Sequence, residues 1–484
     1  MNNWLNRIPQ RYWGYLALCL WGALTFQLLH KTPFGIDEGA ARSLLLIWSV
    51  VDQIANPVVT LGVPDFRVVF LAPIGYLWTG SLMAAKVFSL LLMAAATWTF
   101  HTWRQHSGES ESALLASGLL LISPLVADQI DTISVGPYLL LVFGLGAWLD
   151  RMYREKPLAF GGIYFTQMLL CLTSVTLHPA GLAYPAVLAW SWYKQPLSVK
   201  QQKYFVGGIS TAVIFALFLT SGWRNVTWLS NPLPSLADAV AGPLLSNNAV
   251  GNWIVGGGML AIMLLIVWRQ RAILLGDLLG RTLIFALVVG ALAGDATWGM
   301  LTLATCLYWG LPLLLRGNKA GGFLGQRGVA LILVFALSTL FMFSDKTRYQ
   351  LVQHEIMPPN DQLIKTLVEH TDAIKKAEEA DPGAAPPTKK SLRVASQWPG
   401  RTMVACRCDT LPLPPPVKNE QALLAMLRGI NFLIFDPQDI DNRSLVRHLA
   451  LLAGETETVS LEQGGVIVQV KKPLPVKAQQ LPKP

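Results

Sequence analysis

The sequence predicts an α-helical polytopic membrane protein of about 11 transmembrane helices, followed by a small C-terminal soluble α/β domain. Of its 484 residues, 52% are hydrophobic and only 14% are charged, whereas soluble domains carry roughly 25% charged residues. Apolar stretches near membrane-spanning length recur up to residue 344, and strand-like and helical patterns alternate after it. This composition excludes a disordered chain and a coiled coil, and five cysteines are too few for a disulfide framework.

The expected membrane domain covers residues 1–344. Its candidate spans are the apolar stretches 12–30, 84–101, 112–127, 133–149, 159–175, 179–193, 204–221, 253–268, 282–294, 298–315 and 328–343. Two arginines precede the first stretch and no small-residue cleavage site follows it, so it is expected to be a retained span and not a signal peptide. These spans leave a first outer loop at residues 30–83 and a long outer loop at 222–252.

The basic residues of the membrane domain are distributed one-sidedly. With the N-terminus inside, 15 of the 20 lysines and arginines before residue 345 fall in inner segments, as the positive-inside rule requires. A further crossing at the apolar run Val68–Trp78 would invert every later loop, so this run is expected in or on the membrane without crossing it. The excess charge of +9 therefore reflects topology, and no nucleic-acid partner is expected. The odd number of spans predicts a multi-pass protein of a bacterial cytoplasmic (inner) membrane, with a cytoplasmic N-terminus and a periplasmic C-terminal domain.

Residues 345–472 are expected to form the soluble outer domain, and the Pro- and Lys-rich residues 473–484 a disordered tail. Pro359-Asn360-Asp361 is expected to begin a helix, and the charged, then Ala/Pro-rich segment Lys375–Ala385 to be a flexible connection. The expected strands are Leu392–Ser396, Thr402–Cys406, Asn431–Phe435 and Val466–Val470. The helical patterns among them are Glu420–Leu427 and Ser444–Leu452.

Three minor patterns are given structural interpretations. Gly256–Gly258 lies inside an apolar span, which favours close helix packing over a phosphate-binding loop. Cys406 and Cys408 have no further ligands at metal-binding spacing, so a structural role is expected for both. The three aspartates within residues 436–441 could bind a cation, but a solvated turn after a strand is favoured.

The strongest chemical signal comes just after the first span. Asp37 and Glu38 are adjacent carboxylates at the start of an amphipathic helical pattern. A helix N-terminus favours negative charge, so a purely structural role in the first turn is one interpretation. A position held at the membrane interface also suits acid–base chemistry, which is the other interpretation. Other outer acidic residues, among them Asp128, Asp238 and Asp295, are expected to be solvated loop residues.

Further motifs follow this pair in order. The proline-containing stretch Val63–Arg67 is followed by Thr79–Ser89, which reads Thr-Gly-Ser-Leu-Met-Ala-Ala-Lys-Val-Phe-Ser, then by Ser123–Thr132 and Leu177–Gly181. This order resembles that of the GT-C membrane glycosyltransferases, in particular the branch of aminoarabinose (lipid A) transferases and protein O-mannosyltransferases. In that branch an Asp-Glu pair leads an interfacial helix and a re-entrant stretch, and a phrase like Thr79–Ser89 opens the second span.

The resemblance implies an inverting glycosyltransferase that moves a sugar from a polyprenyl-phosphate donor to a lipid, glycan or protein acceptor on the outer face. A general base must deprotonate the acceptor hydroxyl, and the resemblance gives this role to Asp37. The further catalytic candidates are Glu38 and Asp131. Cationic side chains must receive the donor phosphate, and the candidates are Arg67, Lys86 and Arg224. The candidates for acceptor or loop contacts are Arg42, Asp65 and His178.

The chain departs from the family pattern in two places. The family's re-entrant stretch usually reads like Lys-Pro-Pro-Leu, whereas Val63–Arg67 contains a carboxylate and a displaced arginine. The long outer loop has no histidine, so the metal site is undefined and a divalent ion is the one cofactor considered.

Two other classes stay open. One is a transporter or flippase, although the chain shows no inverted repeat and almost no ionisable residue at mid-membrane depth. The other is a diverged, non-catalytic membrane subunit of an envelope or polysaccharide system. Under the enzyme interpretation the partners are the polyprenyl-phosphate-linked sugar, membrane lipids and an acceptor of undefined chemistry.

Overall fold

The structure, a computed structural model, describes most of the chain. The described residues are 21–22, 25, 35–52, 65–108, 110–155, 160–194, 199–219, 232–244, 248–315, 326–353, 359–379, 392–416, 420–452, 454–462 and 465–471. The chain divides into two compact units, the first comprising Met1–Pro33 with Pro64–Gln350, and the second Phe34–Val63 with Leu351–Pro484. Part of the first outer loop thus groups with the C-terminal segment, whereas the sequence placed the whole loop, residues 30–83, in the membrane domain.

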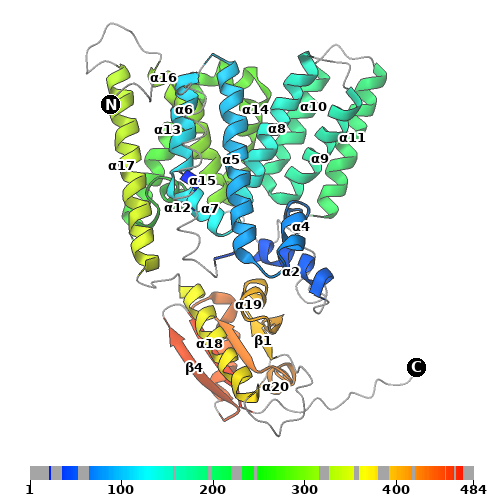
Figure 1. The fold of residues 1–484 in the computed structure, drawn as a ribbon, viewed down its shortest axis with the longest axis vertical. Helices are drawn as coiled ribbons and strands as arrows, with labels where there is room; N and C mark the ends of the chain where they lie inside the picture. The colour runs from blue at the N-terminus through cyan, green and yellow to red at the C-terminus, as the bar shows by residue number, and fades with distance from the viewer. Residues whose placement is uncertain are drawn as a thin grey trace, which may run out of the picture. The chain divides into compact units, whose positions relative to one another are not determined.

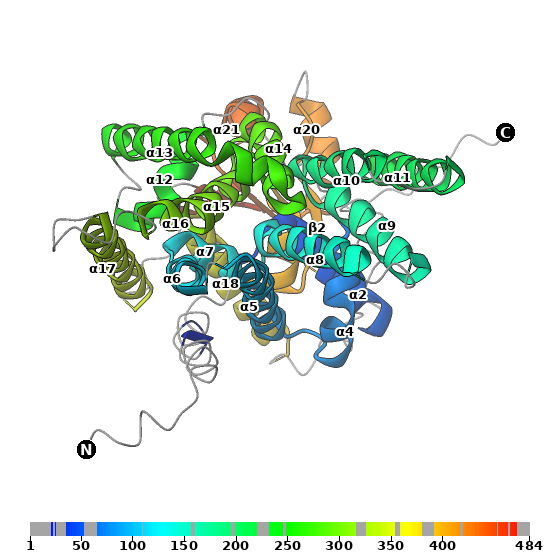
Figure 2. The ribbon, with the colours of Figure 1, turned by 90° about the horizontal axis from the view of Figure 1, so that it is seen from above.

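The first unit is helical throughout its described residues (Figures 1 and 2). Its elements are α4 (Arg67–Leu77), α5 (Leu82–His106), α6 (Ser110–Leu121), α7 (Pro124–Asp131), α8 (Val135–Glu155), α9 (Phe160–Leu177), η3 (Pro179–Leu182), α10 (Ala183–Tyr193), α11 (Val199–Phe218), α12 (Leu233–Ala241), η5 (Gly242–Leu244), α13 (Ala249–Gly276), α14 (Leu278–Ala293), α15 (Ala296–Thr305), η6 (Cys306–Gly310), α16 (Leu311–Leu315) and α17 (Gln326–Gln353). Helix α5 packs against both α6 and α8, and α12 packs against α13 and α15.

Ten of the eleven expected spans have helical counterparts from α5 to α17, and the span 12–30 lies almost entirely outside the described residues. By length and composition, two described helices, α5 and α13, can cross a membrane alone, and the α6–α7 pair makes a third if it counts as one span. The count of about 11 therefore stays a prediction. Helix α4 has 11 residues and rises only about 16 Å, too short to cross the roughly 30 Å hydrocarbon core of a bilayer.

The expected span 112–127 is broken into two helices bent by 53°. Proline at position 124 has no N–H group and cannot continue the preceding helix. Instead it takes the first position of α7, where a missing N–H costs nothing. The hydroxyl of Ser123 accepts a hydrogen bond from the N–H of Val126 at 3.3 Å, which caps the new helix. The bend places Asp131 at the end of a short separate helix.

Close helix packing depends on glycine at particular positions. A Cβ on Gly256 would overlap the backbone carbonyl of Leu233 in α12, so this glycine allows α13 and α12 to touch. Its neighbours Gly257 and Gly258 face open space. The expected packing role of this glycine run is therefore confirmed at its first residue alone.

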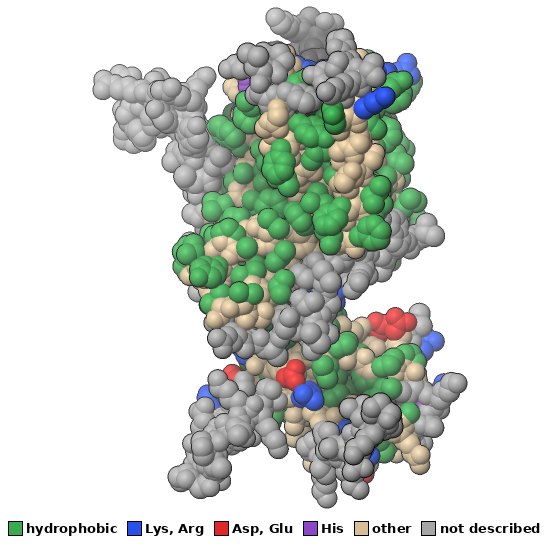
Figure 3. Space-filling model, turned by 90° about the vertical axis from the view of Figure 1, so that its right-hand side faces the viewer, with side chains coloured by type: hydrophobic (Ala, Val, Ile, Leu, Met, Phe, Trp, Pro, Cys, Tyr) green, Lys and Arg blue, Asp and Glu red, His purple; other side chains and the backbone are tan. Residues whose placement is uncertain are grey.

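The surface of the helical unit is strongly apolar. Hydrophobic side chains cover much of the face seen in Figure 3. Phe218, Ile254 and Trp268 are among the large hydrophobic side chains that are more than half exposed. An apolar surface of this extent is unfavourable in water and matches contact with lipid.

The second unit is built around a five-stranded sheet in the order β2-β1-β3-β5-β4. Its elements are α2 (Glu38–Asp52), α18 (Pro359–Glu379), β1 (Arg393–Ser396), α19 (Pro399–Cys406), β2 (Asp409–Pro412), α20 (Glu420–Met426), β3 (Phe432–Phe435), η7 (Ile440–Asn442), α21 (Arg443–Leu451), β4 (Thr456–Glu462) and β5 (Gly465–Val470). Strand β1 pairs in parallel with β2 and β3, and β5 pairs antiparallel with β3 and β4. The expected small α/β domain is therefore present.

Both faces of this sheet are covered by helices. Leu363 and Leu367 of α18 pack with Ile434 and Ile467 on one face, while Leu433 and helices α20 and α21 form a core on the other. Because the central strands are buried on both sides, β3 is a continuous apolar run and not an alternating pattern. Cys406 and Cys408 are buried in the same core as Leu363 and Leu367, in agreement with a structural role.

One strand expectation is wrong and two strands were missed. Residues Thr402–Cys406 were expected to form a strand but belong to α19. Proline at position 399 occupies the first turn of this helix, where its fixed backbone angle favours helix formation. Strands β2 and β4 have polar or short sequences without the apolar alternation that predicts a strand. The expected flexible connection and the C-terminal tail lie mostly outside the described residues.

Candidate functional site

A buried ion pair joins two of the expected site residues in the helical unit. Lys86 lies in the second turn of α5, and Asp131 ends α7. The Nζ atom of Lys86 is 2.6 Å from Oδ1 of Asp131, and the lysine side chain is 1% exposed. Burying either charge alone is costly, and in this pair the two opposite charges compensate each other. The sequence named both residues but did not predict that they pair.

A second ion pair is formed at the start of α4. Nη2 of Arg67 is 2.5 Å from Oδ2 of Asp65, and Nε lies within 3.0 Å of both carboxylate oxygens. Oδ1 of Asp65 also accepts the backbone N–H of Arg67, the first residue of α4, at 2.9 Å. Both side chains are almost fully buried. The carboxylate that departs from the family pattern thus binds the displaced arginine directly.

The two cations converge on one segment of chain. Nη1 of Arg67 donates to the backbone carbonyl oxygen of Ile133 at 2.7 Å, two residues after the Asp131 partner of Lys86. Ile133 has φ = 54°, a left-handed conformation that is unfavourable for a β-branched residue. The N–H of Ser134 donates to the carbonyl of Gln129 at 2.9 Å, which closes the end of α7 as in a Schellman motif.

We call Asp65, Arg67, Lys86, Asp131 and Ile133 the α7-end cluster. It contains two cations and two carboxylates, so its formal charge is zero. Sequence reasoning missed Ile133, because a backbone carbonyl leaves no signal in residue type. The pairing of Asp65 with Arg67 had a detectable signal, since the two are separated by one residue.

His178 is fixed by two hydrogen bonds on opposite sides of its ring. Nδ1 accepts the backbone N–H of Ala180 at 3.1 Å, and Nε2 lies 2.8 Å from Oδ2 of Asp295. Since Nδ1 accepts, the network assigns the proton to Nε2, which donates to the carboxylate. Asp295, expected to be a solvated loop residue, is therefore the partner of a candidate site residue.

The surroundings of the Asp295 carboxyl favour its ionised form. Burial opposes its charge, but the hydrogen bond and attraction from His178, together with the backbone N–H groups of Trp298 and Thr297, outweigh this effect. The pKa of the carboxyl is consequently below its usual 3.8. Its signal in the sequence was its place before Ala296, since aspartate is a preferred N-cap residue, here of α15.

The Asp37–Glu38 pair belongs to the second unit and begins α2. Oδ1 of Asp37 accepts the backbone N–H of Ala40 at 2.9 Å, so Asp37 is the N-cap of this helix. Glu38 lies 3.6 Å from Nη2 of Arg42 one turn later. The expected helix start is thus confirmed, while the catalytic role of Asp37 stays a prediction.

Glu38 also caps a second helix far away in the sequence. Its Oε1 accepts the N–H of Gly400 at 2.6 Å and its Oε2 accepts the N–H of Arg401 at 3.2 Å, both at the start of α19. Burial raises the pKa of the Glu38 carboxyl, although these two N–H groups act against the rise. At the other end of α19, the guanidinium of Arg407 lies 4.4 Å from the ring centre of Trp48 on α2, within cation–π range. Together these contacts form the α2–α19 clamp, which connects the Asp37 helix to the α/β domain.

Replacing Glu38 with alanine is expected to loosen the start of α19. Hydrogen bonds from backbone N–H groups to a carboxylate stabilise by about 1.5–3 kcal/mol, so the Gly400 and Arg401 amides should exchange faster. Hydrogen–deuterium exchange of peptides covering residues 399–406 measures this effect. Glu369→Ala changes an exposed glutamate of α18 and should leave that exchange unchanged. Equal exchange in both variants would contradict the capping role.

Asp238 belongs to α12, which lies within the expected long outer loop and packs against α7, the helix of Asp128. Burial raises the pKa of the Asp238 carboxyl to about 6, and the negative charge of Asp128 adds to the rise. These two residues were expected to be solvated loop residues. Asp128 is exposed, as expected, although it lies on α7 and not in a loop, whereas Asp238 is half-buried on α12.

Stability is expected to fall as pH rises from about 4 to about 6, because the folded state keeps an Asp238 proton that the unfolded chain releases near pH 3.8. Asp238→Asn removes this proton and should flatten the slope. Thermal unfolding of the purified protein across this range measures the effect, and Asp441→Asn, at an exposed position of η7, serves as the control. Identical slopes for wild type and Asp238→Asn would refute the assignment.

The remaining expectations concern metal ions and the long outer loop. Arg224 lies outside the described residues. Within the part of the chain that the structure describes, no group of three or more histidine, cysteine, aspartate or glutamate side chains could hold a metal ion. Oδ1 of Asp436 and Oδ1 of Asp439 accept the backbone N–H groups of Gln438 and Asp441. These bonds form turns, as the favoured interpretation of this segment predicts.

Comparison with known proteins identifies the fold. The chain matches no protein-family model, and no curated protein shows a significant sequence match to it. The structure is similar to the crystal structure of ArnT from Cupriavidus metallidurans bound to undecaprenyl phosphate. The similarity covers 95% of this chain and 98% of that chain, with a TM-score of 0.52 and 11% sequence identity. ArnT is an aminoarabinose lipid A transferase of the GT-C class, so the GT-C-like fold expected from the motifs is confirmed.

Proposed function

We propose that this protein is a membrane glycosyltransferase of the GT-C type, which transfers a sugar from a polyprenyl-phosphate donor to a lipid, glycan or protein acceptor on the outer face of the cytoplasmic membrane. The proposal rests on the α7-end cluster. The cluster holds two cations, Arg67 and Lys86, in buried ion pairs at the ends of helices. Cations in such a place suit the binding of a phosphate, and the structurally similar ArnT was crystallised with undecaprenyl phosphate bound. A donor anchored in the bilayer by its lipid chain needs no nucleotide-binding domain.

In the proposed reaction, Asp37 removes the proton from the acceptor hydroxyl as its oxygen attacks the anomeric carbon of the sugar. The bond from that carbon to the phosphate oxygen breaks, and its electron pair leaves with the polyprenyl phosphate. Arg67 and Lys86 stabilise the negative charge on the departing phosphate. A single displacement of this kind inverts the anomeric configuration.

The ion pairs define how the donor would enter the α7-end cluster. Arg67 and Lys86 already contact carboxylates, so a phosphate must share these cations with Asp65 and Asp131. The cluster has a formal charge of zero before the donor arrives, so it can bind an anionic phosphate tightly only if the two carboxylates move away from Arg67 and Lys86.

One observation favours the non-catalytic alternative. Both described candidate cations are ion-paired, and Glu38 is engaged in capping α19. These contacts are what a structural subunit of an envelope system would also need. The enzyme and the subunit differ in one respect, because only the enzyme loses function when Asp37 is neutralised without unfolding.

The test combines binding and product analysis. Native mass spectrometry of the full-length protein in nanodiscs should detect bound undecaprenyl phosphate, and Lys86→Met should weaken it. Mass spectrometry of lipids and envelope glycans should show a modification that disappears in cells lacking the protein. Restoration by the wild type and not by Asp37→Asn supports the enzyme. Restoration by both proteins overturns it in favour of the subunit.

A further inference from the structure

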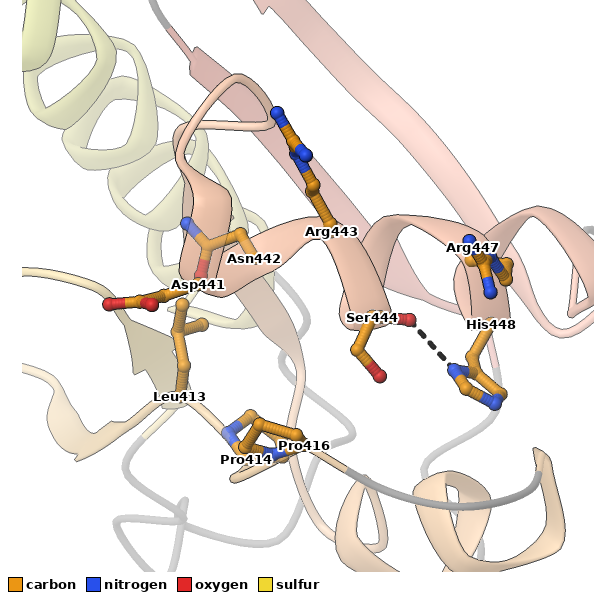
Figure 4. A pocket seen from close by; sticks show the side chains of 9 residues that line it. All are labelled: Leu413, Pro414, Pro416, Asp441, Asn442, Arg443, Ser444, Arg447 and His448. Carbon is orange, nitrogen blue, oxygen red and sulfur yellow. Dashed lines mark hydrogen bonds between the residues drawn. The ribbon is translucent and has the colours of Figure 1, made fainter.

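A pocket of about 760 Å³ lies in the α/β domain, and none of the candidate catalytic or donor-binding residues described above lines it. Its lining comes from two segments, the stretch Leu413–Pro416 that follows β2 and the stretch Asp441–His448 that begins α21 after β3 (Figure 4). Strands β2, β1 and β3 are parallel, so the carboxyl ends of β2 and β3 meet at one edge of the sheet. Ligands of open α/β sheets bind in the crevice outside this edge.

The α21 side of the pocket is basic. Arg443, Arg447 and His448 line it, with Asp441 as the one acidic side chain among its lining residues. Arg443 and Arg447 are exposed and one helical turn apart, a spacing at which like charges repel. Among the residues that the structure describes, neither guanidinium forms an ion pair. An anionic ligand bound between these two arginines would relieve the repulsion between their positive charges.

The hydrogen bonds within the pocket determine which side-chain atoms remain available to contact that ligand. The Nδ1 atom of His448 lies 2.7 Å from the carbonyl oxygen of Ser444, so the proton is on Nδ1 and Nε2 remains for other contacts (Figure 4). In that view the Ser444 and His448 side chains point toward Pro414 and Pro416, while Arg443 extends to the opposite side of α21.

The rim of the pocket is rigid where it joins the sheet. Asn442 is buried and donates to the Asp436 carbonyl at 2.8 Å and to Oε1 of Gln397 at 3.0 Å. Gln397 also donates to Asp439 at 2.7 Å. These bonds hold the loop after β3 against the end of β1, so the start of α21 is positioned before any ligand arrives.

We propose that this pocket binds a phosphate ester whose phosphate contacts Arg447 and Ser444, with His448 beside its organic part and Arg443 at the rim. Guanidinium and hydroxyl groups supply several donors for the oxygens of one phosphate. With its proton on Nδ1, His448 can accept a hydrogen bond at Nε2 from a hydroxyl group of the ester. Leu413, Pro414 and Pro416 form an apolar wall against which the organic part of the ester packs. Asp441 is the one carboxylate among the lining residues, whereas a hard cation such as Ca²⁺ or Mg²⁺ is bound by several oxygen ligands.

The test uses the full-length protein in nanodiscs and follows arginine modification by phenylglyoxal, read residue by residue by mass spectrometry. Glycerol 3-phosphate should protect Arg447 and reduce its rate of modification by about tenfold, whereas chloride at equal ionic strength should not. A second arm compares nanodiscs of phosphatidylcholine with nanodiscs containing phosphatidic acid. Protection in the first arm alone identifies a soluble ester as the source, and protection in the second a lipid headgroup.

Variants separate specific binding from general attraction. Arg447→Gln should weaken the binding of glycerol 3-phosphate by about tenfold. Arg428→Gln removes an exposed arginine of the same domain that does not line the pocket, and it should leave the affinity within about twofold. Equal losses in both variants, or no protection by either phosphate source, would overturn the proposal. Neither result bears on sugar transfer, because no pocket residue belongs to the proposed transfer site.

Discussion

Replacing Asp37 with asparagine is expected to lower the rate of sugar transfer by about 10²–10⁴-fold, with folding unchanged. Asparagine keeps the shape of the side chain and its ability to cap α2 through the Ala40 N–H. It cannot accept the proton of the acceptor hydroxyl. The variant therefore separates the two interpretations of the Asp-Glu pair, because a cap survives this substitution and a general base does not.

A matched control is available in the helical unit. Oδ1 of Asp277 accepts the N–H of Gly280 at 2.5 Å and caps α14 in the same manner as Asp37 caps α2. Asp277→Asn should therefore leave the transfer rate unchanged while testing the effect of an Asp-to-Asn change at an N-cap. The rate is measured as product formed per amount of folded protein in membranes. Full activity of Asp37→Asn would show that the residue is only a cap.

Breaking the Lys86–Asp131 ion pair is expected to destabilise the helical unit by about 3–5 kcal/mol. Lys86→Met leaves the Asp131 carboxylate buried without its lysine, and Asp131→Leu does the reverse. The double variant should regain most of this stability, because two apolar side chains of similar size can replace a buried ion pair. Thermal unfolding of the purified single and double variants measures these differences.

Function and stability should separate in the double variant. If Lys86 contacts the donor phosphate, the double variant folds but does not bind undecaprenyl phosphate. The exposed pair Arg393–Asp409, at 2.8 Å, is the control, since removing a surface ion pair costs only about 0.2–1 kcal/mol. A stability loss at Lys86 no greater than at Arg393 would show that the buried pair is unimportant. Unchanged donor binding in a folded double variant would remove Lys86 from the proposed site.

Local sequence patterns predicted the secondary structure correctly wherever the residues of a segment determine it by themselves. The long apolar stretches predicted the helices of the first unit, and the continuous apolar run at Phe432–Phe435 predicted β3. The break at Ser123-Pro124 could also have been predicted, because both the cap and the missing N–H are local features. The strand wrongly expected at Thr402–Cys406 is different, since the carboxylate that caps this helix comes from Glu38, more than 360 residues away.

The sequence by itself determined the fold class and the identity of the chemical groups. Asp37, Lys86 and Asp131 were chosen from motif order, and their residue types define what each can do. The tertiary structure decided the partners, because charge pairing depends on distances that chain spacing does not specify. It joined Lys86 to Asp131 across 45 residues and His178 to Asp295 across 117. A buried charge must find a partner wherever the packing of helices brings one, so those pairs follow from the fold and not from any local pattern.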